Sequence, residues 1–311
     1  MKIKGIFLSL LLTVAAITPS GALDRWLARE DGGQPGAFLR YGAGARAFGM
    51  GKTFVGVADD ASTVYWNPAG LGQIARREVT ALYATLYEET NYSFIGYAHP
   101  LAGSGTIGAA VISLDSKGFQ LRDAFNDEMG EGSLSEMAGI VSFGKALIVK
   151  DDQERLSAGA SIKVVRQVVD SYSAMGYGAD MGVLGRIGDH MTLGMSVQNI
   201  IAPKLKLSQA TDEYPLSVTL GMGYRLLDNR LMLALDVNKT MYREYTLHVG
   251  GEYTLMEMLS FRAGIDETEL SCGIGFTYKG YSLDYAFAFH DAWQGHDGLG
   301  ESHRIGLTKR F

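Results

Sequence analysis

Isolated charged residues recur in the second half of the sequence, inside stretches that are otherwise small or apolar. They carry both signs: Lys163, Asp180, Arg225, Asp236, Glu252, Arg262, Asp266, Asp284 and Arg304. An ion-selective pore usually shows a ring of one sign. Because acids and bases are mixed here, the pattern favours an interior network of ion pairs, in which Glu252 and Arg262 face each other across a turn near Glu257. We expect this lumen network to include Lys163, Asp180, Glu252, Arg262 and Asp284.

Residues suited to catalysis or metal binding are few. His290, His296 and His303 cluster with Asp291 and Asp297, but the glycine-rich loop there would not fix the three or four converging ligands of a metal site. The hydrolase signatures Gly-x-Ser-x-Gly and His-Glu-x-x-His are absent from the sequence. We therefore expect no enzymatic activity, no metal and no cofactor.

Composition narrows the class of protein further. Of 311 residues, 47% are hydrophobic and 20% are charged, which is too apolar for a disordered chain. The net charge of −6 offers no basic excess to neutralise phosphates, so we expect no nucleic-acid partner. Glycine occurs 40 times, well above the usual share of about 7%. This glycine excess needs a structural reason.

The N-terminus has the pattern of a secretory signal peptide. Lys2 and Lys4 precede an apolar run from Ile6 to Ile17, and small residues follow up to Ala22. The run is too short for a spanning helix, which needs about 20 apolar residues. We expect residues 1–22 to be removed and the mature chain to be exported.

From Glu78 onwards the sequence alternates with a period of two, which is typical of β-strands. One face of each segment is apolar and aromatic, and the other consists of Gly, Ser, Thr and isolated charges. A small polar face suits the narrow interior of a closed barrel. About fourteen such segments occur, near 79–87, 92–99, 105–115, 133–144, 155–166, 174–187, 191–199, 215–226, 231–238, 245–255, 259–266, 270–278, 281–290 and 302–311.

An even number of strands of about ten residues is what an outer-membrane barrel requires. We therefore predict an all-β fold, a transmembrane antiparallel barrel of about 14 strands over residues 79–311. Connections alternate between short turns and long external loops, the longest being expected at 116–132, 200–214 and 291–301. The short turn Lys279-Gly280 predicts a register that pairs Tyr278 with Tyr281. The same register pairs Phe276 with Leu283, Ile274 with Tyr285 and Cys272 with Phe287.

Two further features indicate a lipid environment. Tyr224, Tyr253, Tyr278 and Tyr281 lie next to short turns, where an aromatic girdle would meet the membrane interface. The chain ends in an aromatic residue, Phe311, on an alternating last strand. Such an end resembles the signal that barrel-assembly machinery recognises, although Lys309 departs from the pattern.

Residues 23–78 lack the alternation and are rich in Gly and Ala. Asp59 or Asp60 could begin a short helix that Pro68 ends. Because the segment is too small to fold alone, we expect it to lie inside the barrel as a hatch. Its apolar residues, together with those of the 116–132 loop, are candidates for contact with a hydrophobic ligand: Phe38, Phe48, Met50, Phe54, Tyr65, Trp66, Phe119, Leu121, Phe125 and Met129. Equally, these side chains could simply pack the hatch.

Three motifs of this segment resemble the N-terminal signature of the PorV/PorQ family, a branch of the FadL-like outer-membrane barrels. They are Gly44-Ala-Arg-Ala-Phe-Gly-Met-Gly51, Ala58-Asp-Asp-Ala61 and Tyr65-Trp-Asn-Pro-Ala-Gly-Leu71. The resemblance implies a fourteen-stranded barrel with a hatch that carries the Asn67-Pro68-Ala69 element and Gly70. FadL-like proteins pass hydrophobic molecules, whereas some PorV-type proteins dock exported cargo in type IX secretion.

Three functional hypotheses follow from the sequence. The first is a conduit for hydrophobic small molecules across the bacterial outer membrane. The second is a component of type IX secretion whose external loops contact cargo or other secretion proteins, and the third is a structural envelope barrel without transport. Outer-membrane lipid is a partner in each case, and barrel-assembly machinery is a partner during biogenesis.

Overall fold

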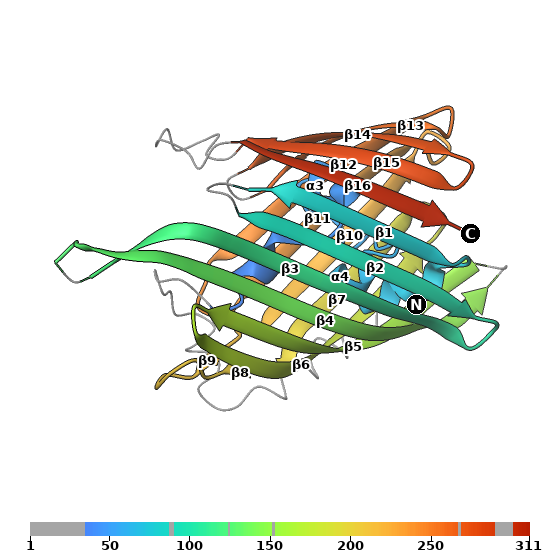
Figure 1. The fold of residues 1–311 in the computed structure, drawn as a ribbon. Coiled ribbons are helices and arrows are strands. Elements are labelled where there is room, and N and C mark those ends of the chain that lie inside the picture. Colours follow the sequence, from blue (N-terminus) through green and yellow to red (C-terminus); the bar gives the residue numbers. More distant parts are fainter. Residues whose placement is uncertain (1–34, 87–89, 124, 151–152, 267–268, 290–300) are drawn as a thin grey trace.

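The protein is a closed all-β barrel of fourteen antiparallel strands (Figure 1). The computed structural model describes residues 35–86, 90–123, 125–150, 153–266, 269–289 and 301–311. The predicted fold class is confirmed. The barrel strands are β1 (Glu78–Thr85), β2 (Asn91–Leu101), β3 (Gly105–Arg122), β4 (Glu128–Lys150), β5 (Gln153–Val169), β6 (Tyr172–Ile187), β7 (Met191–Ile201), β10 (Ser217–Leu226), β11 (Leu231–Thr240), β12 (Tyr245–Leu255), β13 (Leu259–Ile265), β14 (Leu270–Tyr278), β15 (Tyr281–Phe289) and β16 (Glu301–Arg310).

Each strand pairs with its neighbours in the chain, and β1 pairs with β16 to close the barrel. Between β7 and β10 the chain forms a separate two-stranded sheet of β8 (Lys204–Leu205) and β9 (Asp212–Glu213), within the connection expected to be a long loop. The C-terminal end of β16 lies at the end of the barrel that carries the short turns (Figure 1, right), called the short-turn end below. The opposite end is called the hairpin end.

The predicted register across the last turn is confirmed: Tyr278 pairs with Tyr281 and Cys272 with Phe287. Lys279 and Gly280 have φ values of 48° and 79°, and two residues with positive φ make the tight turn that suits twisted antiparallel strands. The predicted pairing of Glu252 with Arg262 is also confirmed.

The two faces of the strands differ as the alternation predicts. Large apolar side chains cover the outer face; Leu220 is 44% and Phe276 48% exposed there. Tyr281 also lies on the outer face beside a short turn, and the ammonium of Lys309 lies 3.5 Å from the centre of its ring. This cation–π contact explains why a lysine is tolerated on the outer face of the last strand.

The prediction of a long loop at 116–132 is wrong. Strands β3 and β4 continue past the barrel rim as a two-stranded hairpin, with Phe119 opposite Gly132 (Figure 1, left). The polar–apolar alternation of this stretch is itself a strand pattern. Gly132 leaves space that the rings and branches of Phe119 and Leu121 fill. The predicted loop at 291–301 lies outside the described residues, apart from Glu301 at the start of β16.

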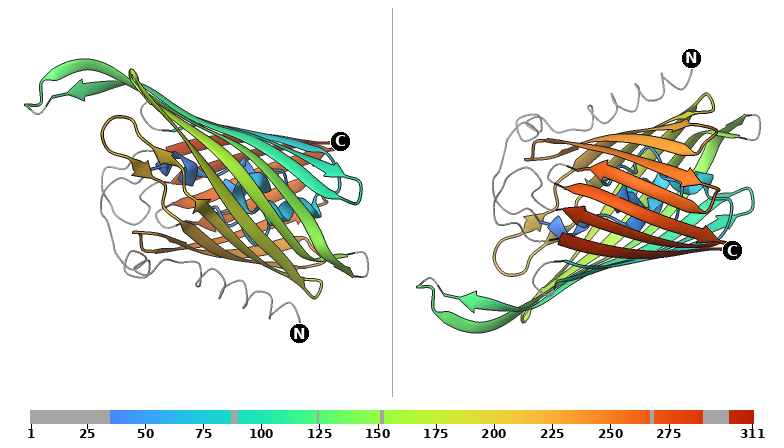
Figure 2. Two further views of the ribbon diagram at one scale, coloured as in Figure 1. Left: turned by 90° about the horizontal axis from the view of Figure 1, so that it is seen from below. Right: turned by 90° about the horizontal axis from the view of Figure 1, so that it is seen from above.

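Residues 35–77, called the hatch, lie within the barrel (Figures 1 and 2). The hatch consists of short helices joined by turns: η1 (Ala37–Tyr41), α3 (Ala45–Gly49), α4 (Thr63–Trp66) and η2 (Pro68–Gln73). The predicted signal peptide lies outside the described residues. Within the described part of the chain, no helix has the length and apolarity needed to span a membrane.

The assignment of faces leads to a first prediction. Leu220→Lys places a charge on the lipid side of β10, whereas Thr277→Lys places it in the lumen. We expect Leu220→Lys to lower the free energy of unfolding in lipid by about 2–4 kcal/mol, the cost of a lysine near the bilayer midplane. Urea titration of the heat-modifiable folded band in vesicles measures this value. Equal losses for both variants would mean that the faces are misassigned.

Candidate functional site

The backbone of the hatch touches the barrel wall directly, and it does so at glycines. A β-carbon placed on Gly194 would lie 2.2 Å from the carbonyl oxygen of Val55, and one on Gly159 would lie 2.3 Å from that of Pro68. Distances this short are sterically forbidden. Six strands present such a glycine to the hatch backbone: Gly144, Gly159, Gly194, Gly221, Gly250 and Gly264. On three more strands a glycine lies close to a hatch side chain: Gly108 to Val64, Gly182 to Asn67 and Gly306 to Ala45. This contact is the structural reason for the glycine excess.

Asn67 forms the corner of the hatch that binds strand β6. Its side-chain amide donates hydrogen bonds to the carbonyls of Val55 (3.1 Å) and Val183 (3.2 Å), and its Oδ1 accepts from the backbone N–H of Ala69 (3.1 Å). Pro68 then begins η2, where its missing N–H costs nothing. Gly70 approaches the carbonyl of Ala58, where a β-carbon would be only 2.1 Å away. The Asn67–Gly70 element is buried and docks the hatch.

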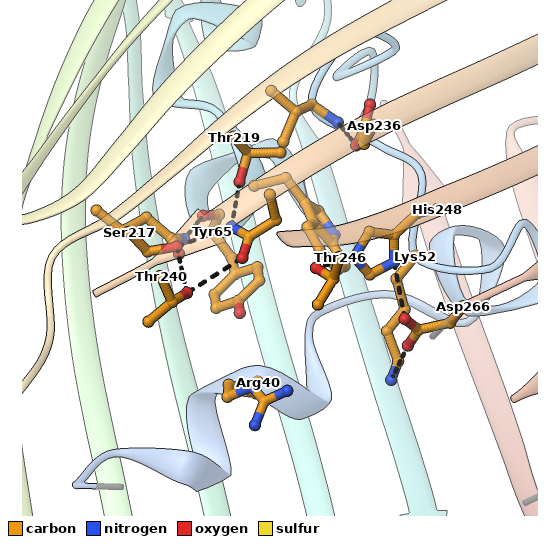
Figure 3. Close-up of a pocket in the computed structure, with 14 residues that line it drawn as sticks. Arg40, Lys52, Tyr65, Ser217, Thr219, Asp236, Thr240, Thr246, His248 and Asp266 are labelled. Atoms are coloured by element: carbon orange, nitrogen blue, oxygen red, sulfur yellow. Dashed lines mark hydrogen bonds and ion pairs between the residues drawn. The ribbon is translucent and has the colours of Figure 1, made fainter. Parts of the chain in front are cut away.

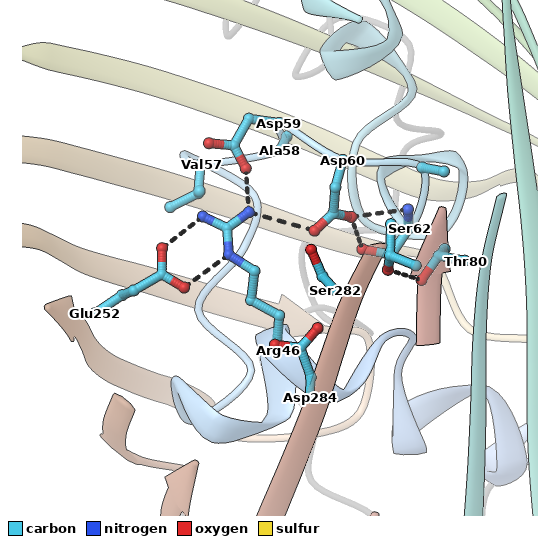
Figure 4. A network of polar contacts seen from close by, with 12 residues as sticks. Arg46, Val57, Ala58, Asp59, Asp60, Ser62, Thr80, Glu252, Ser282 and Asp284 are labelled. Atoms are coloured by element: carbon cyan, nitrogen blue, oxygen red, sulfur yellow. Dashed lines mark hydrogen bonds and ion pairs between the residues drawn. The ribbon is translucent and has the colours of Figure 1, made fainter. Parts of the chain in front are cut away.

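Arg46 is the centre of the polar contacts between hatch and wall (Figure 4). Its Nε and one terminal nitrogen each lie 2.8 Å from an oxygen of Glu252, so the pair is bidentate. Its other terminal nitrogen lies 2.6 Å from Asp59 and 3.3 Å from Asp60. A single guanidinium therefore holds two segments of the hatch and strand β12 together. Bidentate, charge-assisted bonds of this type are among the strongest in proteins.

Burial and ion pairing together determine the pKa values of Arg46 and Asp59. Burial alone would lower the pKa of Arg46, but the carboxylates of Asp59 and Glu252 outweigh it and raise that pKa well above its usual value. Burial would likewise raise the pKa of Asp59, yet Arg46 and Arg225 lower it below the ordinary value. Both groups are thus held in their charged forms.

The predicted lumen residues fall into separate groups. Arg262 joins Glu252 (2.6 Å) to Asp284 (2.7 Å), and this set is linked to the hatch through Arg46. Lys163 and Asp180 form a different buried pair, 2.7 Å apart, on strands β5 and β6. No contact joins that pair to the Arg262 set within the described residues.

Other inward charges bind the hatch individually. One oxygen of Asp236 accepts hydrogen bonds from the backbone N–H groups of Phe54 and Val55, both at 2.9 Å. Asp266 pairs with Lys52 of the hatch at 2.6 Å. The guanidinium of Arg304 lies 4.0 Å from the centre of the Phe48 ring. Sequence reasoning did not identify Arg46, although it is the lone charge in the Gly44–Gly51 run.

The residues predicted to contact a hydrophobic ligand lie in three different places in the structure. Phe48 and Met50 are fully buried in the packed hatch. Tyr65 and Trp66 line a cavity (Figure 3). The residues predicted on the 116–132 loop lie instead on the β3–β4 hairpin outside the barrel, where Phe125 is 86% exposed.

Several cavities border the hatch within the described residues, and two of them lie towards opposite ends of the barrel. The first chamber, of about 110 Å³, lies towards the hairpin end and includes Tyr65, Thr246 and His248 in its wall (Figure 3). The second chamber, of about 270 Å³, lies towards the short-turn end and includes Glu252 and Thr254. In the first chamber His248 lies 2.9 Å from Asp266, which also binds Lys52.

No group of three or more candidate ligands that could hold a metal ion occurs in the part of the chain that the structure describes. Of the clustered histidines, His303 is described, and its ring nitrogen lies 2.6 Å from the hydroxyl of Tyr285. His290 and His296, with Asp291 and Asp297, lie outside the described residues.

The glycine contacts predict how the hatch can be loosened. In Gly182→Ala the new methyl group would meet Oδ1 of Asn67 at 2.0 Å, so the Asn67 corner must move. Gly139→Ala is the matched control, because the space around Gly139 is open. We expect faster proteolysis of the hatch in Gly182→Ala, measured in detergent, with Gly139→Ala unchanged. Identical digestion would contradict tight docking at Gly182.

Removal of Arg46 should weaken the docking of the hatch against the wall and change how that docking depends on pH. Because the pKa of Asp59 is lowered in the folded protein, its ion pairs stabilise docking above the ordinary aspartate pKa of about 3.9 and lose this effect as the pH falls below it. Arg46→Ala leaves partly unpaired carboxylates, at a cost of about 3–5 kcal/mol, and protonation then relieves their repulsion.

Proteolysis of the hatch as a function of pH tests this expectation. Wild-type protein should be uniformly protected from pH 7 to pH 4, while Arg46→Ala should gain protection as the pH falls towards the ordinary carboxyl pKa of about 4. The exposed hatch residue Arg76 supplies the control Arg76→Ala, which should behave as wild type. A pH-independent Arg46→Ala profile would contradict the assigned role.

Comparisons with known proteins agree with this architecture. The toluene transporter TbuX of Ralstonia pickettii superposes with a TM-score of 0.66 at 14% identity, covering 87% of this chain and 98% of that one. The P. putida toluene transporter TodX gives 0.64 at 14% identity, covering 87% and 99%, and a Pseudomonas aeruginosa FadL homologue gives 0.61 at 14%, covering 86% and 98%.

At this identity the likeness establishes the fold alone: the protein has the closed antiparallel β-barrel fold of these transporter and FadL-homologue structures. A comparison of the sequence with curated proteins finds no match. A family model does match residues 29–195, more than half of the chain, which spans the hatch, strands β1 to β6 and the first part of β7. The chain belongs to the uncharacterised protein family UPF0164.

Proposed function

We propose that this protein is an outer-membrane channel that binds hydrophobic small molecules and passes them inward. The observation that carries the proposal is a closed FadL-like barrel whose lumen is filled by a docked hatch. Proteins with the same architecture are described as toluene transporters and as a monoaromatic hydrocarbon channel. A lumen without a transport role would not need so elaborate a closure.

In this proposal residues 1–22 are the export signal, residues 23–78 are the N-terminal segment that contains the hatch, and residues 79–311 are the barrel. The partners are outer-membrane lipid on the apolar outer face and barrel-assembly machinery that recognises the end at Phe311. The hairpin end faces outward and the short-turn end faces the periplasm. A ligand would then first meet the hatch near Tyr65 and Trp66.

A second candidate function rests on the β3–β4 hairpin. It projects beyond the barrel rim, and its tip exposes Phe125 (86%) and Met129 (69%). Exposed apolar side chains on a projecting ribbon suit contact with another protein. This feature, together with the PorV/PorQ-like hatch motifs, supports a role in docking exported cargo.

Native mass spectrometry of the protein, purified gently from its own outer membrane, separates the two candidates. We expect release of a bound hydrophobic small molecule, and saturable uptake of toluene by proteoliposomes. A stoichiometric protein partner with no small molecule would contradict the channel and favour docking. Replacement of residues 118–131 by an Asn-Gly turn is the matched variant: it should leave uptake unchanged and abolish partner binding.

A further inference from the structure

The two chambers are separated by a single layer of the hatch. Along strand β12, Thr246 and His248 line the first chamber, while Glu252 and Thr254 line the second. Between them lies Gly250, whose β-carbon position would be 2.1 Å from the carbonyl oxygen of Met50. From His248 to Glu252 the strand rises about 14 Å at about 3.4 Å per residue. The barrier between the chambers is therefore thin.

The barrier is apolar, whereas the chambers are not. Met50, Phe54 and Val57 of the hatch pack against Met232 and Ala234 of β11 in one buried cluster, called the apolar layer. Phe54 is inaccessible to solvent. Trp66 packs on the same cluster, with its ring centre 6.4 Å from that of Phe54, and also faces the first chamber. The guanidinium of Arg46, in the wall of the second chamber, lies 5.5 Å from the Phe54 ring.

Hydrogen-bonding side chains occur in both chamber walls; the wall of the first chamber mixes polar and apolar surface, and that of the second is mainly polar. In the first chamber Asn238 donates to Ser217 and Thr219, both at 2.8 Å. The second chamber carries hydroxyl pairs on adjacent strands: Thr80 with Thr308 (2.8 Å), Thr254 with Ser260 (3.0 Å) and Thr277 with Ser282 (2.8 Å). The polar groups of these walls can form hydrogen bonds with water and hydrophilic solutes.

Charge in the second chamber is unevenly distributed. Its wall holds five carboxylates and three guanidiniums: Asp59, Asp60, Glu252, Glu257 and Asp284 against Arg46, Arg262 and Arg310. The excess of negative charge attracts cations into a narrow space with low-dielectric walls.

We propose that the apolar layer is a hydrophobic gate between two aqueous chambers, and that local separation of its side chains opens a route for compact hydrophilic solutes, with cations preferred over anions. Hydrophobic constrictions close pores by excluding water. The backbone of Phe54 and Val55 is held by Asp236, and glycines on nine strands contact the hatch. The movement is therefore one of side chains, with the hatch in place. This function goes beyond the passage of hydrophobic molecules proposed above.

Conductance across planar lipid bilayers in KCl tests the gate. Phe54→Ala removes the ring between the chambers, and we expect it to raise the single-channel conductance at least tenfold over wild type. Phe38→Ala is the matched control, because Phe38 is an equally buried hatch ring that belongs to a different cluster. The reversal potential of Phe54→Ala in a KCl gradient should show preference for K⁺.

A second variant leaves the hatch sequence intact. Met232→Ser places a hydroxyl in the apolar layer from the barrel wall, and it should also raise the conductance above that of Phe38→Ala. Heat modifiability confirms that each variant is folded. Folded Phe54→Ala and Met232→Ser proteins that conduct no better than Phe38→Ala would overturn the gate, and an anion-preferring pore would overturn the solute class. Toluene uptake is measured separately, so failure of the gate leaves the proposed channel for hydrophobic molecules untouched.

Discussion

Close approach between two polypeptide backbones governs the interior of this barrel. The hatch carbonyl of Val55 and the wall at Gly194 are so near that no side chain can stand between them. A side chain at several such positions would push the hatch out of register with the wall. The strands therefore need glycine at these positions because of the close contact, although glycine is a poor strand-forming residue. The strands tolerate this cost because their neighbours on both sides complete the ladder around a closed barrel.

The close packing of hatch and wall also explains which groups the inward charged residues bind. Peptide groups of an irregular segment buried against the barrel wall need hydrogen-bond partners. Asp236 supplies one, accepting from two consecutive backbone N–H groups. Arg46 needs compensation in turn, and Asp59 and Glu252 provide it from hatch and wall. Inward charges of both signs are thus the consequence of filling a barrel with a chain that has few regular helices.

Much of the barrel could be predicted from the sequence because its signals are local. Alternation with period two identified the strands, and the two-residue turn at Lys279 set a register that the structure confirms. The β3–β4 hairpin was mistaken for a loop because its polar–apolar alternation was assigned to a surface loop, and a register shift between Lys117 and Phe119 interrupts the strand pattern. The role of Arg46 could not be predicted, since its partner Glu252 is 206 residues away in the chain. Contacts between hatch and wall depend on closure of the barrel, which no local pattern encodes.

The positions of the contacts between hatch and wall indicate how the lumen could open. Glycines of β3 to β7 and of β10, β12, β13 and β16 contact it, so its displacement as a body would break contacts around most of the circumference at once. The cost of separating a few side chains in the apolar layer is far smaller, because each buried aliphatic or aromatic group contributes only about 1.5–3 kcal/mol. In the proposed gate, strain is therefore relieved first at the side chains of the apolar layer, where apolar packing is the main restraint. In this proposal the backbone of the hatch stays in place against the wall, and a solute passes between the side chains of the apolar layer.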